Sequence, residues 1–246
     1  MKTDVLKVGV TGAGGVIGSA LVAGLRARFD LKLFDLHVPQ EKSGLSWQQL
    51  DCAQAESLPG AFDGLDAIIH LAGNPSPTAK MADTLRNNFL ATSLVFEAAK
   101  VAGVKKLVFA SSNFYHQRDI SLALRSAGRK RITLDACATP DCTYAQSKVF
   151  GENLGLHYSY LGLQCIALRI GWTVASDTPV PYDSPYMRAM FCSKRDLVQA
   201  FDKALASRAD FLTAFAISNN RTRVFDLDKT REQLGFEPQD DSASYF

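Results

Sequence analysis

The sequence predicts an α/β protein built on a doubly wound parallel sheet, with a small cap formed by the C-terminal part of the chain. Short apolar runs of strand length alternate with longer segments in which apolar residues recur at helical spacing. Such alternation is typical of a parallel sheet with helices on both faces. The first apolar run leads directly into a glycine-rich turn and a helical segment. With 246 residues, the chain is long enough to bury a sizeable core.

The glycine-rich turn spans residues 11–18, Thr-Gly-Ala-Gly-Gly-Val-Ile-Gly, between an expected strand at 5–10 and a helix with apolar positions four apart from Ile17 to Leu25. A strand that turns at once into a helix needs glycines where side chains would clash with the turn or a ligand. Free N–H groups and the dipole at the helix start attract a pyrophosphate. The spacing fits T-G-x-x-G-x-x-G and predicts a Rossmann-type dinucleotide site. We assign to it Gly12, Gly15, Val16 and Ile17.

Two acidic residues follow the next expected strands. The strand at 31–34 ends at Asp35, about twenty residues past the glycines, where a carboxylate accepts hydrogen bonds from the adenosine ribose. Because that carboxylate also repels a 2′-phosphate, Asp35 favours NAD over NADP. A short strand at 45–50 delivers Asp51 and Cys52 to the same edge. Asp51 there is either close to the adenine or an ordinary loop acid or helix cap.

A fully apolar strand at 67–71 runs into small residues. His70 within it is expected to be a packed or hydrogen-bonded core histidine. Small residues after a strand let the backbone pass close to a cofactor, so Leu71, Ala72 and Gly73 are expected to form a nucleotide wall. The next helix is expected at 83–101, and the polar Asn88 in its middle is either exposed or hydrogen-bonded toward the site.

The next buried strand, at 107–110, delivers Ser111, Ser112 and Asn113 to the edge where open α/β sheets bind ligands. A long polar stretch without a clear period follows at 116–142, and we expect a functional or mobile loop there. Its basic residues are more typical of a solvated face than of an anion site. They are Arg125, Arg129, Lys130 and Arg131.

A helix is expected at 144–160, with Tyr144 and Lys148 four residues apart on one face of its first turn. A lysine ammonium close to a phenol favours the phenolate and is expected to lower its pKa toward the range of a general base. The hydroxyl of Ser112 would complete the set by holding the substrate oxygen. The tyrosine–lysine pair alone is weak evidence, but it gains weight because it follows the glycine-rich turn and the serine-bearing strand.

Five motifs carry a resemblance to a known family. In chain order they are TGAGGVIG, HLAG, NNFLATSLVFEAAK, FASSN and YAQSK. Together they resemble the extended short-chain dehydrogenase/reductase (NAD-dependent epimerase/dehydratase) superfamily over nearly the whole chain. The resemblance implies NAD as the cofactor and Ser112, Tyr144 and Lys148 as catalytic residues, with Asn88 in the supporting helix.

Three further stretches, LVFASSN, SKVFGENLGLHY and LRIG, are most similar to bacterial uronate dehydrogenases, as is the short C-terminal region. Those enzymes oxidise the anomeric carbon of galacturonate or glucuronate to a lactone with NAD. This chain departs from their pattern in the substrate half, with Phe114 in place of a histidine and Trp172 in place of a serine. The arginine that holds the uronate carboxylate has no clean match among Tyr186 and Arg188. We expect Arg188 to take this role, with the loop around Arg129 as the second choice.

The resemblance and the strand ends together predict two sets of binding residues. Besides the four in the glycine turn, the cofactor set comprises Asp35, Asp51, Cys52, Leu71, Ala72, Gly73, Asn88, Ser111, Tyr144, Lys148 and Ile170. The substrate set comprises Ser76, Ser112, Asn113, Phe114, Trp172 and Arg188.

The last third of the chain is expected to add a strand at 164–170, a substrate loop at 171–186, a helix at 195–206 and a capped short helix within 225–238. We therefore divide the chain into an NAD-binding domain, 1–170, which carries the catalytic residues, and a small substrate region, 171–246, interleaved with the last sheet elements. The cap is too short for a full nucleotide-sugar subdomain, which favours a small substrate.

Composition narrows the partners. A net charge of +2 is too weak to argue for nucleic acid or a membrane surface, and no apolar run approaches the ~20 residues of a membrane span. Five scattered cysteines show no metal-ligand spacing and fit reduced thiols in a cytoplasmic protein without an export signal. The helices at 83–101 and 144–160 either form a homo-oligomer face or pack on the sheet.

The sequence thus predicts an NAD-dependent dehydrogenase for a sugar acid or a related small polyhydroxy compound. Two alternatives stay open. A sugar epimerase uses the same residues but retains its NAD, and a nucleotide-sensing protein binds NAD without turnover; the complete serine, tyrosine and lysine set argues against the second.

Overall fold

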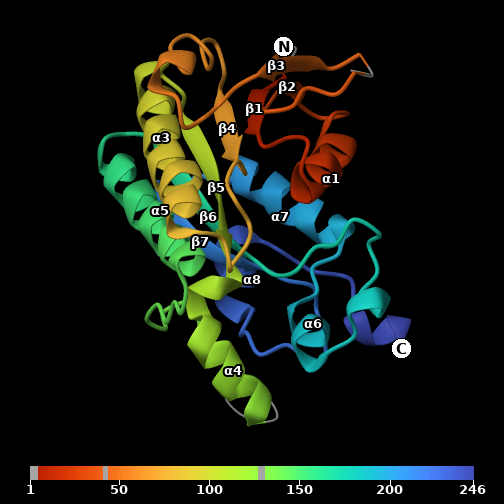
Figure 1. Cartoon of the computed structure of the whole chain (residues 1–246). Coiled ribbons are helices and arrows are strands. Elements are labelled where there is room, and N and C mark those ends of the chain that lie inside the picture. The colour runs from red at the N-terminus through yellow and green to blue at the C-terminus, as the bar shows by residue number, and fades with distance from the viewer. Residues whose placement is uncertain (1–4, 41–43, 127–130) are drawn as a thin grey trace.

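The computed structural model describes residues 5–40, 44–126 and 131–246. Within these ranges, seven parallel strands form one twisted sheet in the order β3-β2-β1-β4-β5-β6-β7 (Figure 1). The strands are β1 (Lys7–Thr11), β2 (Asp30–Asp35), β3 (Ser46–Gln49), β4 (Ala67–His70), β5 (Lys106–Ser112), β6 (Gln164–Ile170) and β7 (Phe211–Ala216). The strand order reverses between β1 and β4, and open α/β sheets bind ligands in the crevice at such a switch point.

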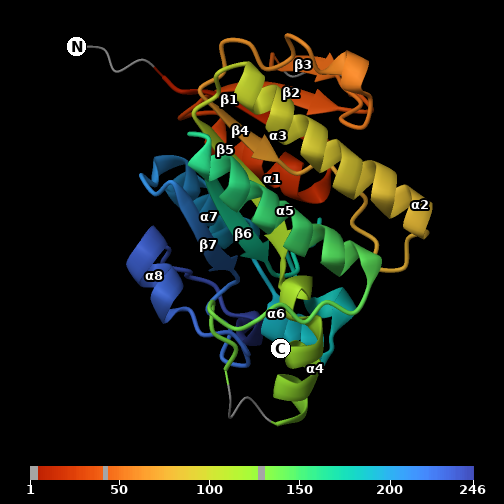
Figure 2. The ribbon, with the colours of Figure 1, turned by 90° about the vertical axis from the view of Figure 1, so that its left-hand side faces the viewer.

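Helices cover both faces of the sheet, as the alternating pattern predicted. On one face lie α1 (Val16–Leu25) and α7 (Lys194–Ala206), which contact each other. On the other face, α3 (Ala91–Val101) and α5 (Thr143–Tyr160) lie side by side (Figure 2). Each face buries its own apolar core, and the fold is the expected Rossmann-type doubly wound sheet.

The helix expected at 83–101 is not one regular α-helix. It begins as α2 (Met81–Thr84), passes through a π-helical segment, η2 (Leu85–Leu90), and continues as α3. π-helical turns inside α-helices are rare and frequent at functional sites. Asn88 lies in this segment and is buried.

The expectation of an aperiodic loop at 116–142 was wrong for its first part. After a short turn, η3 (Asn113–His116), helix α4 (Gln117–Arg125) extends away from the sheet. Its apolar residues fall on one face, where Ile120 and Ala123 are buried, but the helix has only 9 residues and is shorter than the segment over which a helical period is recognised. Strand β7 was also not predicted, although it completes the sheet beside β6.

The basic cluster in that stretch lies partly outside the described residues. Arg129 and Lys130 fall in the range 127–130, whereas Arg125 and Arg131 are exposed.

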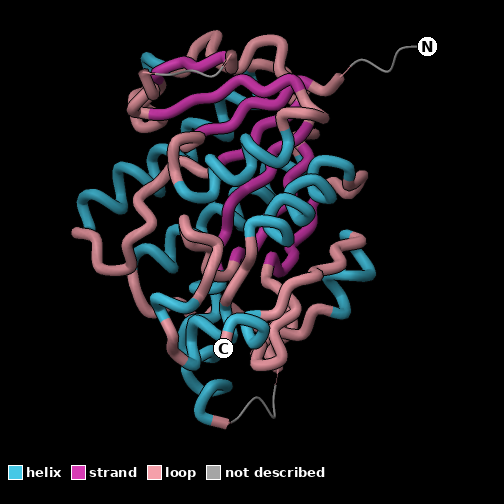
Figure 3. The backbone as a smooth tube through the Cα atoms, turned by 90° about the vertical axis from the view of Figure 1, so that its right-hand side faces the viewer, coloured by secondary structure: helices cyan, strands magenta, loops and turns pink. Residues whose placement is uncertain are grey.

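The short C-terminal elements gather at the carboxyl ends of the strands. They are η4 (Val180–Tyr182), α6 (Pro185–Met190), α8 (Asp228–Leu234) and η5 (Ser242–Tyr245). Figure 3 shows these loops and short helices below the strands, and the C-terminus lies beside α6 (Figure 1). Helix α8 ends at Gly235 in a left-handed conformation, as the predicted cap requires. A separate small core joins α4, α6 and the end of β7.

Within the range 171–246, β7 is the last strand of the main sheet and α7 packs on one face of that sheet. Among the helices in the described ranges, none is long and apolar enough to cross a membrane.

Candidate active site

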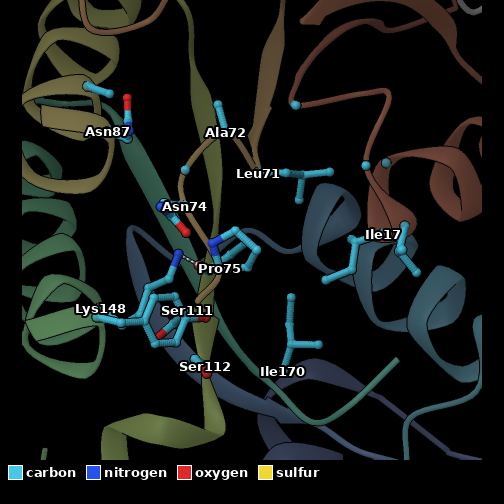
Figure 4. Close-up of a pocket in the computed structure, with 18 of the residues that line it drawn as sticks. Ile17, Leu71, Ala72, Asn74, Pro75, Asn87, Ser111, Ser112, Lys148 and Ile170 are labelled. Carbon is cyan, nitrogen blue, oxygen red and sulfur yellow. Dashed lines mark hydrogen bonds between the residues drawn. The ribbon is translucent and has the colours of Figure 1, made fainter. Parts of the chain in front are cut away.

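A large cavity of about 1020 Å³ lies at the carboxyl ends of the central strands. Its lining comes from the turn between β1 and α1, the ends of β2, β4, β5 and β6, and the start of α5. Figure 4 shows Ile17 and Leu71 on one side of this cavity and Ser111, Ser112 and Lys148 on the other. A cavity of this size suits a dinucleotide together with a small substrate.

The glycine turn forms the phosphate end of the cavity. Gly12 has φ +72°, and a Cβ there would lie 2.8 Å from the backbone nitrogen of Ala72. At Gly18 a Cβ would lie 2.5 Å from the carbonyl oxygen of Gly12. Neither position can hold a side chain, so strand β4 and helix α1 both approach the turn closely. Gly15 caps α1, whose first N–H groups face the cavity side where an anion is favoured.

Asp35 stands at the end of β2 and lines the cavity. One carboxylate oxygen accepts a 2.9 Å hydrogen bond from the backbone N–H of Gly14, and the other accepts one of 3.2 Å from that of His37. These contacts hold the carboxylate beside the glycine turn. This placement is what a ribose-binding acid requires.

Asp51 both lines the cavity and acts as a loop acid. It accepts a 2.9 Å hydrogen bond from Ala53 N–H and forms a 2.5 Å ion pair with Arg86. Burial works to raise the pKa of Asp51, but the hydrogen bonds and the Arg86 charge outweigh it and hold the pKa below its usual range. The two readings of Asp51 from sequence are therefore compatible in space.

His70 is a structural histidine, as expected. Its Nδ1 lies 2.8 Å from the hydroxyl of Thr11, and its Nε2 lies 3.2 Å from that of Thr92. Complete burial, together with the charge of Lys148, lowers the pKa of His70 to about 3, so the ring is neutral. A neutral ring fixed on both sides ties β4 to β1 and α3 directly behind the nucleotide wall.

Tyr144, Lys148 and Ser112 meet at the centre of the cavity. The Ser112 hydroxyl donates a 3.2 Å hydrogen bond to Asn113 Oδ1 and accepts one of 3.2 Å from the Phe114 N–H. Lys148 Nζ donates a 2.9 Å hydrogen bond to the Ala110 carbonyl and lies 5.5 Å from the centre of the Tyr144 ring (Figure 4). The first turn of α5 and the end of β5 thus present the three side chains together.

The pKa of Tyr144 does not follow the sequence-based expectation. Burial raises the pKa of Tyr144 above its ordinary value, and the neighbouring Ser112 side chain opposes that shift only in part. Burial also lowers the pKa of Lys148 to about 8. Desolvation is therefore the largest influence on the pKa of both groups in this structure.

Asn88 does not line the cavity but supports it. Its Oδ1 accepts a 2.8 Å hydrogen bond from Asn74 N–H, and its Nδ2 donates to the Asn74 carbonyl at 3.0 Å and to the Ser147 hydroxyl at 3.1 Å. Ser147 in turn donates to the backbone carbonyl of Tyr144 at 2.7 Å. The amide therefore joins the loop after β4 to the first turn of α5, and the adjacent Asn87 lines the cavity instead.

A buried ion pair lies behind the substrate end. Arg169 on β6 bonds Glu152 on α5 at 2.9 and 2.8 Å, and Ser111 donates to the same glutamate at 2.5 Å. Arg169 Nη1 lies 2.9 Å from Nε2 of His116, whose burial, followed by the Arg169 charge, lowers its pKa to about 3. Two charges paired in this way hold the ends of β5 and β6 in register behind Ser112.

Most sequence-predicted site residues line the cavity among the described residues. Every member of the cofactor set except Asn88 lines the cavity. The members of the substrate set that line it are Ser112, Asn113, Phe114 and Trp172. Ser76 lies in the loop after β4, where its hydroxyl is 3.1 Å from that of Thr78. Arg188 lies outside the lining, because it is held by Asp183 at 2.6 and 2.9 Å and stacks on Phe246 at 3.9 Å. The structure therefore does not bring Arg188 into the position expected of a carboxylate clamp.

Several lining residues were missed from sequence. They are Gly14, Gly18, Leu36, His37, Leu50, Ala53, Asn74, Pro75, Pro77, Asn87, Ala91, Ala110, Gly171, Thr173 and Tyr186. Most of them follow a strand end by a few residues. That position in the sequence could have predicted that they line the cavity. Tyr186 belongs to α6 and reaches the cavity through tertiary packing.

The glycine cradle, Asp35 and the Ser112–Tyr144–Lys148 group fit a bound NAD, and together with the fold they define a dinucleotide-dependent oxidoreductase. A family profile described as "NAD dependent epimerase/dehydratase family" matches residues 8–179. The chain belongs to this family.

Named relatives act on differently charged sugars. The chain is 35% identical to the L-arabinose 1-dehydrogenase (NAD(P)(+)) of Haloferax volcanii over 97% of this chain and 98% of that one. It is 31% identical to the NAD-dependent glucose-6-phosphate dehydrogenase of the same organism, over 96% and 94%. The uronate dehydrogenase structure from Agrobacterium tumefaciens superposes with a TM-score of 0.83 at 27% identity, over 98% of this chain and 87% of that one. The protein is accordingly an NAD-dependent dehydrogenase of the short-chain type.

Proposed function

We propose that the protein oxidises a small sugar or sugar acid in its ring form. The reacting atom is the hydroxyl-bearing anomeric carbon, and the product is the corresponding lactone. The observation that carries this proposal is that Ser112, Tyr144 and Lys148 line the same cavity as the glycine turn and Asp35, which fit NAD. A base, an oxygen-holding hydroxyl and a cofactor groove are then in one connected space.

NAD, when bound, accepts the hydride and places a positive charge near the reacting carbon. Tyr144 as the phenolate takes the proton of the substrate hydroxyl, and Ser112 donates a hydrogen bond to the same oxygen. Lys148, held by the Ala110 carbonyl, faces Tyr144 and the nucleotide side of the cavity, where it supports the phenolate and the nicotinamide ribose. Asn88 keeps the start of α5 in place through Ser147.

The substrates named for the relatives support a sugar as the class of substrate. A NAD-retaining epimerase is the alternative that the same catalytic residues allow. A nucleotide-sensing protein without turnover is disfavoured because the catalytic set is spatially assembled. The five cysteines are free, which supports the cytoplasm as the compartment of action.

The test is NADH formation with a panel of aldoses, uronates and polyols. We expect stoichiometric NADH and lactone from at least one sugar. Tightly retained NAD with isomerised sugar and no net NADH would identify the epimerase instead. NAD binding with no conversion of any kind across the panel would leave the sensing protein.

A further inference from the structure

The substrate end of the cavity has aromatic walls. Phe114, Trp172 and Tyr186 all line it. The ring centres of Phe114 and Tyr186 lie 6.5 Å apart, those of Trp172 and Tyr186 lie 5.9 Å apart, and Phe114 meets Tyr144 edge-on at 5.6 Å. The three rings, which we call the aromatic box, therefore stand directly beside the catalytic phenol.

Neighbouring groups hold each ring of the box in place. The Nδ2 of Asn113 donates a 2.7 Å hydrogen bond to the Tyr186 hydroxyl. Trp172 packs against Tyr182 at 5.5 Å, and its backbone bridges to the end of α6, where its N–H donates to Met190. The N–H of Phe114 donates to Ser112 at 3.2 Å. The box is preformed, so little ordering cost remains for a ligand that fits it.

Charge at this end is already balanced within the protein. Among the described residues that line the cavity, Lys148 is the one lysine or arginine, and its ammonium is bonded to the Ala110 carbonyl. The carboxylates Asp35 and Asp51 lie at the opposite, nucleotide end. Arg188, the nearest arginine in sequence to the substrate loop, is paired with Asp183 and covered by Phe246.

An anionic substituent on the substrate would thus lose its hydration in the box without gaining a lysine or arginine partner from the described residues around the box. Burying an unpaired carboxylate or phosphate is strongly unfavourable. The C–H face of a sugar ring, in contrast, gains contact area against aromatic rings. The hydroxyls of the ring find neutral partners in Asn74, Asn113, Thr173 and the Tyr186 hydroxyl.

We propose, resting on the proposed function, that the aromatic box of Phe114, Trp172 and Tyr186 selects an uncharged sugar ring and rejects its carboxylate and phosphate counterparts. Tyr186 is the central specificity-determining residue because its ring contacts the rings of both Phe114 and Trp172. Its burial raises the pKa of the phenol, so it stays a neutral hydrogen-bonding group.

The first test uses substrates that differ at one carbon. Glucose and glucuronate, and galactose and galacturonate, share a ring and differ in a hydroxymethyl or carboxylate group; glucose 6-phosphate extends the series. We expect kcat/KM for NADH formation to be at least about tenfold higher for the neutral member of a pair, since an unpaired buried charge costs more than the 1.4 kcal/mol of a tenfold change. Equal or higher kcat/KM for the uronate or the phosphate would overturn the proposal.

A binding measurement separates this proposal from the proposed function. Trp47 and Trp172 are the two tryptophans of the chain, so Trp47→Phe leaves Trp172 as its tryptophan reporter. With NAD present, we expect neutral sugars to change Trp172 fluorescence as they bind. The Kd obtained from the same signal should be at least about tenfold higher for uronates. Neutral-sugar binding without NADH would uphold the box and overturn the proposed function. Uronate binding as tight as that of neutral sugars, together with NADH formation, would uphold the proposed function and overturn the box. If no sugar changed the fluorescence or formed NADH, both the box and the proposed function would be overturned.

A pair of variants tests the box itself. Trp172→Ala is expected to raise KM for the neutral sugar about tenfold while KM for NAD stays within about twofold, because stacking on one aromatic ring is lost. Tyr160→Ala is the matched control, since Tyr160 is 80% exposed at the end of α5 and does not line the cavity. An unchanged sugar KM in Trp172→Ala would remove Trp172 from the substrate contacts and overturn the box.

A second pair tests the charge argument. Tyr186→Arg places a cation in the box and is expected to improve kcat/KM for the uronate relative to its neutral partner by about tenfold. Tyr186→Phe keeps the ring and is expected to leave the preference for neutral sugars in place. A uronate preference in Tyr186→Phe would show that the hydroxyl, and not the absence of a cation, sets the selectivity.

Discussion

The two ends of the cavity are built in different ways. The nucleotide end consists mainly of backbone at strand ends, with Gly12 and Gly18 packed so closely that no side chain fits. The substrate end consists of side chains that come from η3, the loop after β6 and helix α6. The first end depends on the register of parallel strands, whereas the second depends on how short C-terminal elements pack.

This difference has a consequence for specificity. A site made of backbone N–H groups changes little when surface residues change, because every residue supplies the same groups. A site made of ring faces changes with a single substitution. The nucleotide end is therefore expected to keep its ligand, and the substrate end to vary, among chains that share this sheet.

The largest effect is expected at the junction of the two ends. Tyr144→Phe removes the base and should lower kcat by about 10²–10⁴-fold. NAD affinity should stay nearly unchanged, because the ring and Lys148 remain. Since burial raises the pKa of Tyr144, wild-type kcat/KM is expected to rise with pH in the alkaline range as the phenolate forms.

Steady-state rates with the best sugar and NAD titration of the same preparations provide the measurement. Activity close to that of the wild type in Tyr144→Phe would remove the residue from the base role. A matched loss of NAD affinity would show that the two ends are not separable at this residue.

A buried neutral histidine lies behind each end of the cavity, His70 behind the nucleotide end and His116 behind the substrate end. We expect the free energy of unfolding to fall at acid pH because of both histidines. The pKa values of His70 and His116 are lowered from 6.5 to about 3 by burial. Between these values the unfolded chain binds protons that the folded chain does not, so the free energy of unfolding falls as the pH falls. The loss is up to about 1.4 kcal/mol per pH unit for each histidine.

Urea unfolding of wild type, His70→Asn and His116→Gln at neutral and mildly acid pH measures this slope. Each variant should show a shallower dependence on pH than the wild type. His157→Gln is the control, because His157 is exposed and should leave the slope unchanged. Identical slopes in all four proteins would contradict the assignment.

A smaller effect is expected at the ribose position. Asp35→Ala should raise the Kd for NAD about tenfold or more, because hydrogen bonds to a carboxylate are lost. The ratio of NADP to NAD affinity should increase, since a 2′-phosphate no longer meets a negative charge. Asp30→Ala, at the exposed start of the same strand, is the control. An unchanged affinity ratio would remove Asp35 from the ribose site.

The smallest effect is expected at Arg188. Its guanidinium is paired with Asp183 on the surface and does not line the cavity. Because surface ion pairs contribute little to the free energy of folding, Arg188→Ala should fold normally. The sugar KM and the NAD Kd should stay within about twofold of the wild type. Arg195→Ala, which breaks a similar exposed pair with Asp240, is the matched control. A strong rise of KM for a uronate in Arg188→Ala alone would restore the carboxylate clamp predicted from sequence.

Local sequence was sufficient for most of the sheet and for the strand ends that form the nucleotide end of the cavity. Apolar runs located six of the seven strands, and the glycine turn, Asp35 and the Tyr144–Lys148 pair indicated where strand ends and the first turn of a helix would meet. These features are short in sequence, and parallel-sheet topology brings strand ends to one edge without further information. The helix α4 and strand β7 were missed because both segments are short, with 9 and 6 residues.

The sequence by itself therefore determined the fold class and the class of enzyme, and it indicated the residues that we propose as the cofactor groove and the catalytic group of this protein. The tertiary structure decided that Asn88 supports the site from behind, that burial raises the pKa of Tyr144, and that Tyr186 faces the cavity while Arg188, two residues later, does not. Desolvation and the direction of a side chain on a short helix depend on what packs around them, and those neighbours come from segments far apart in the chain.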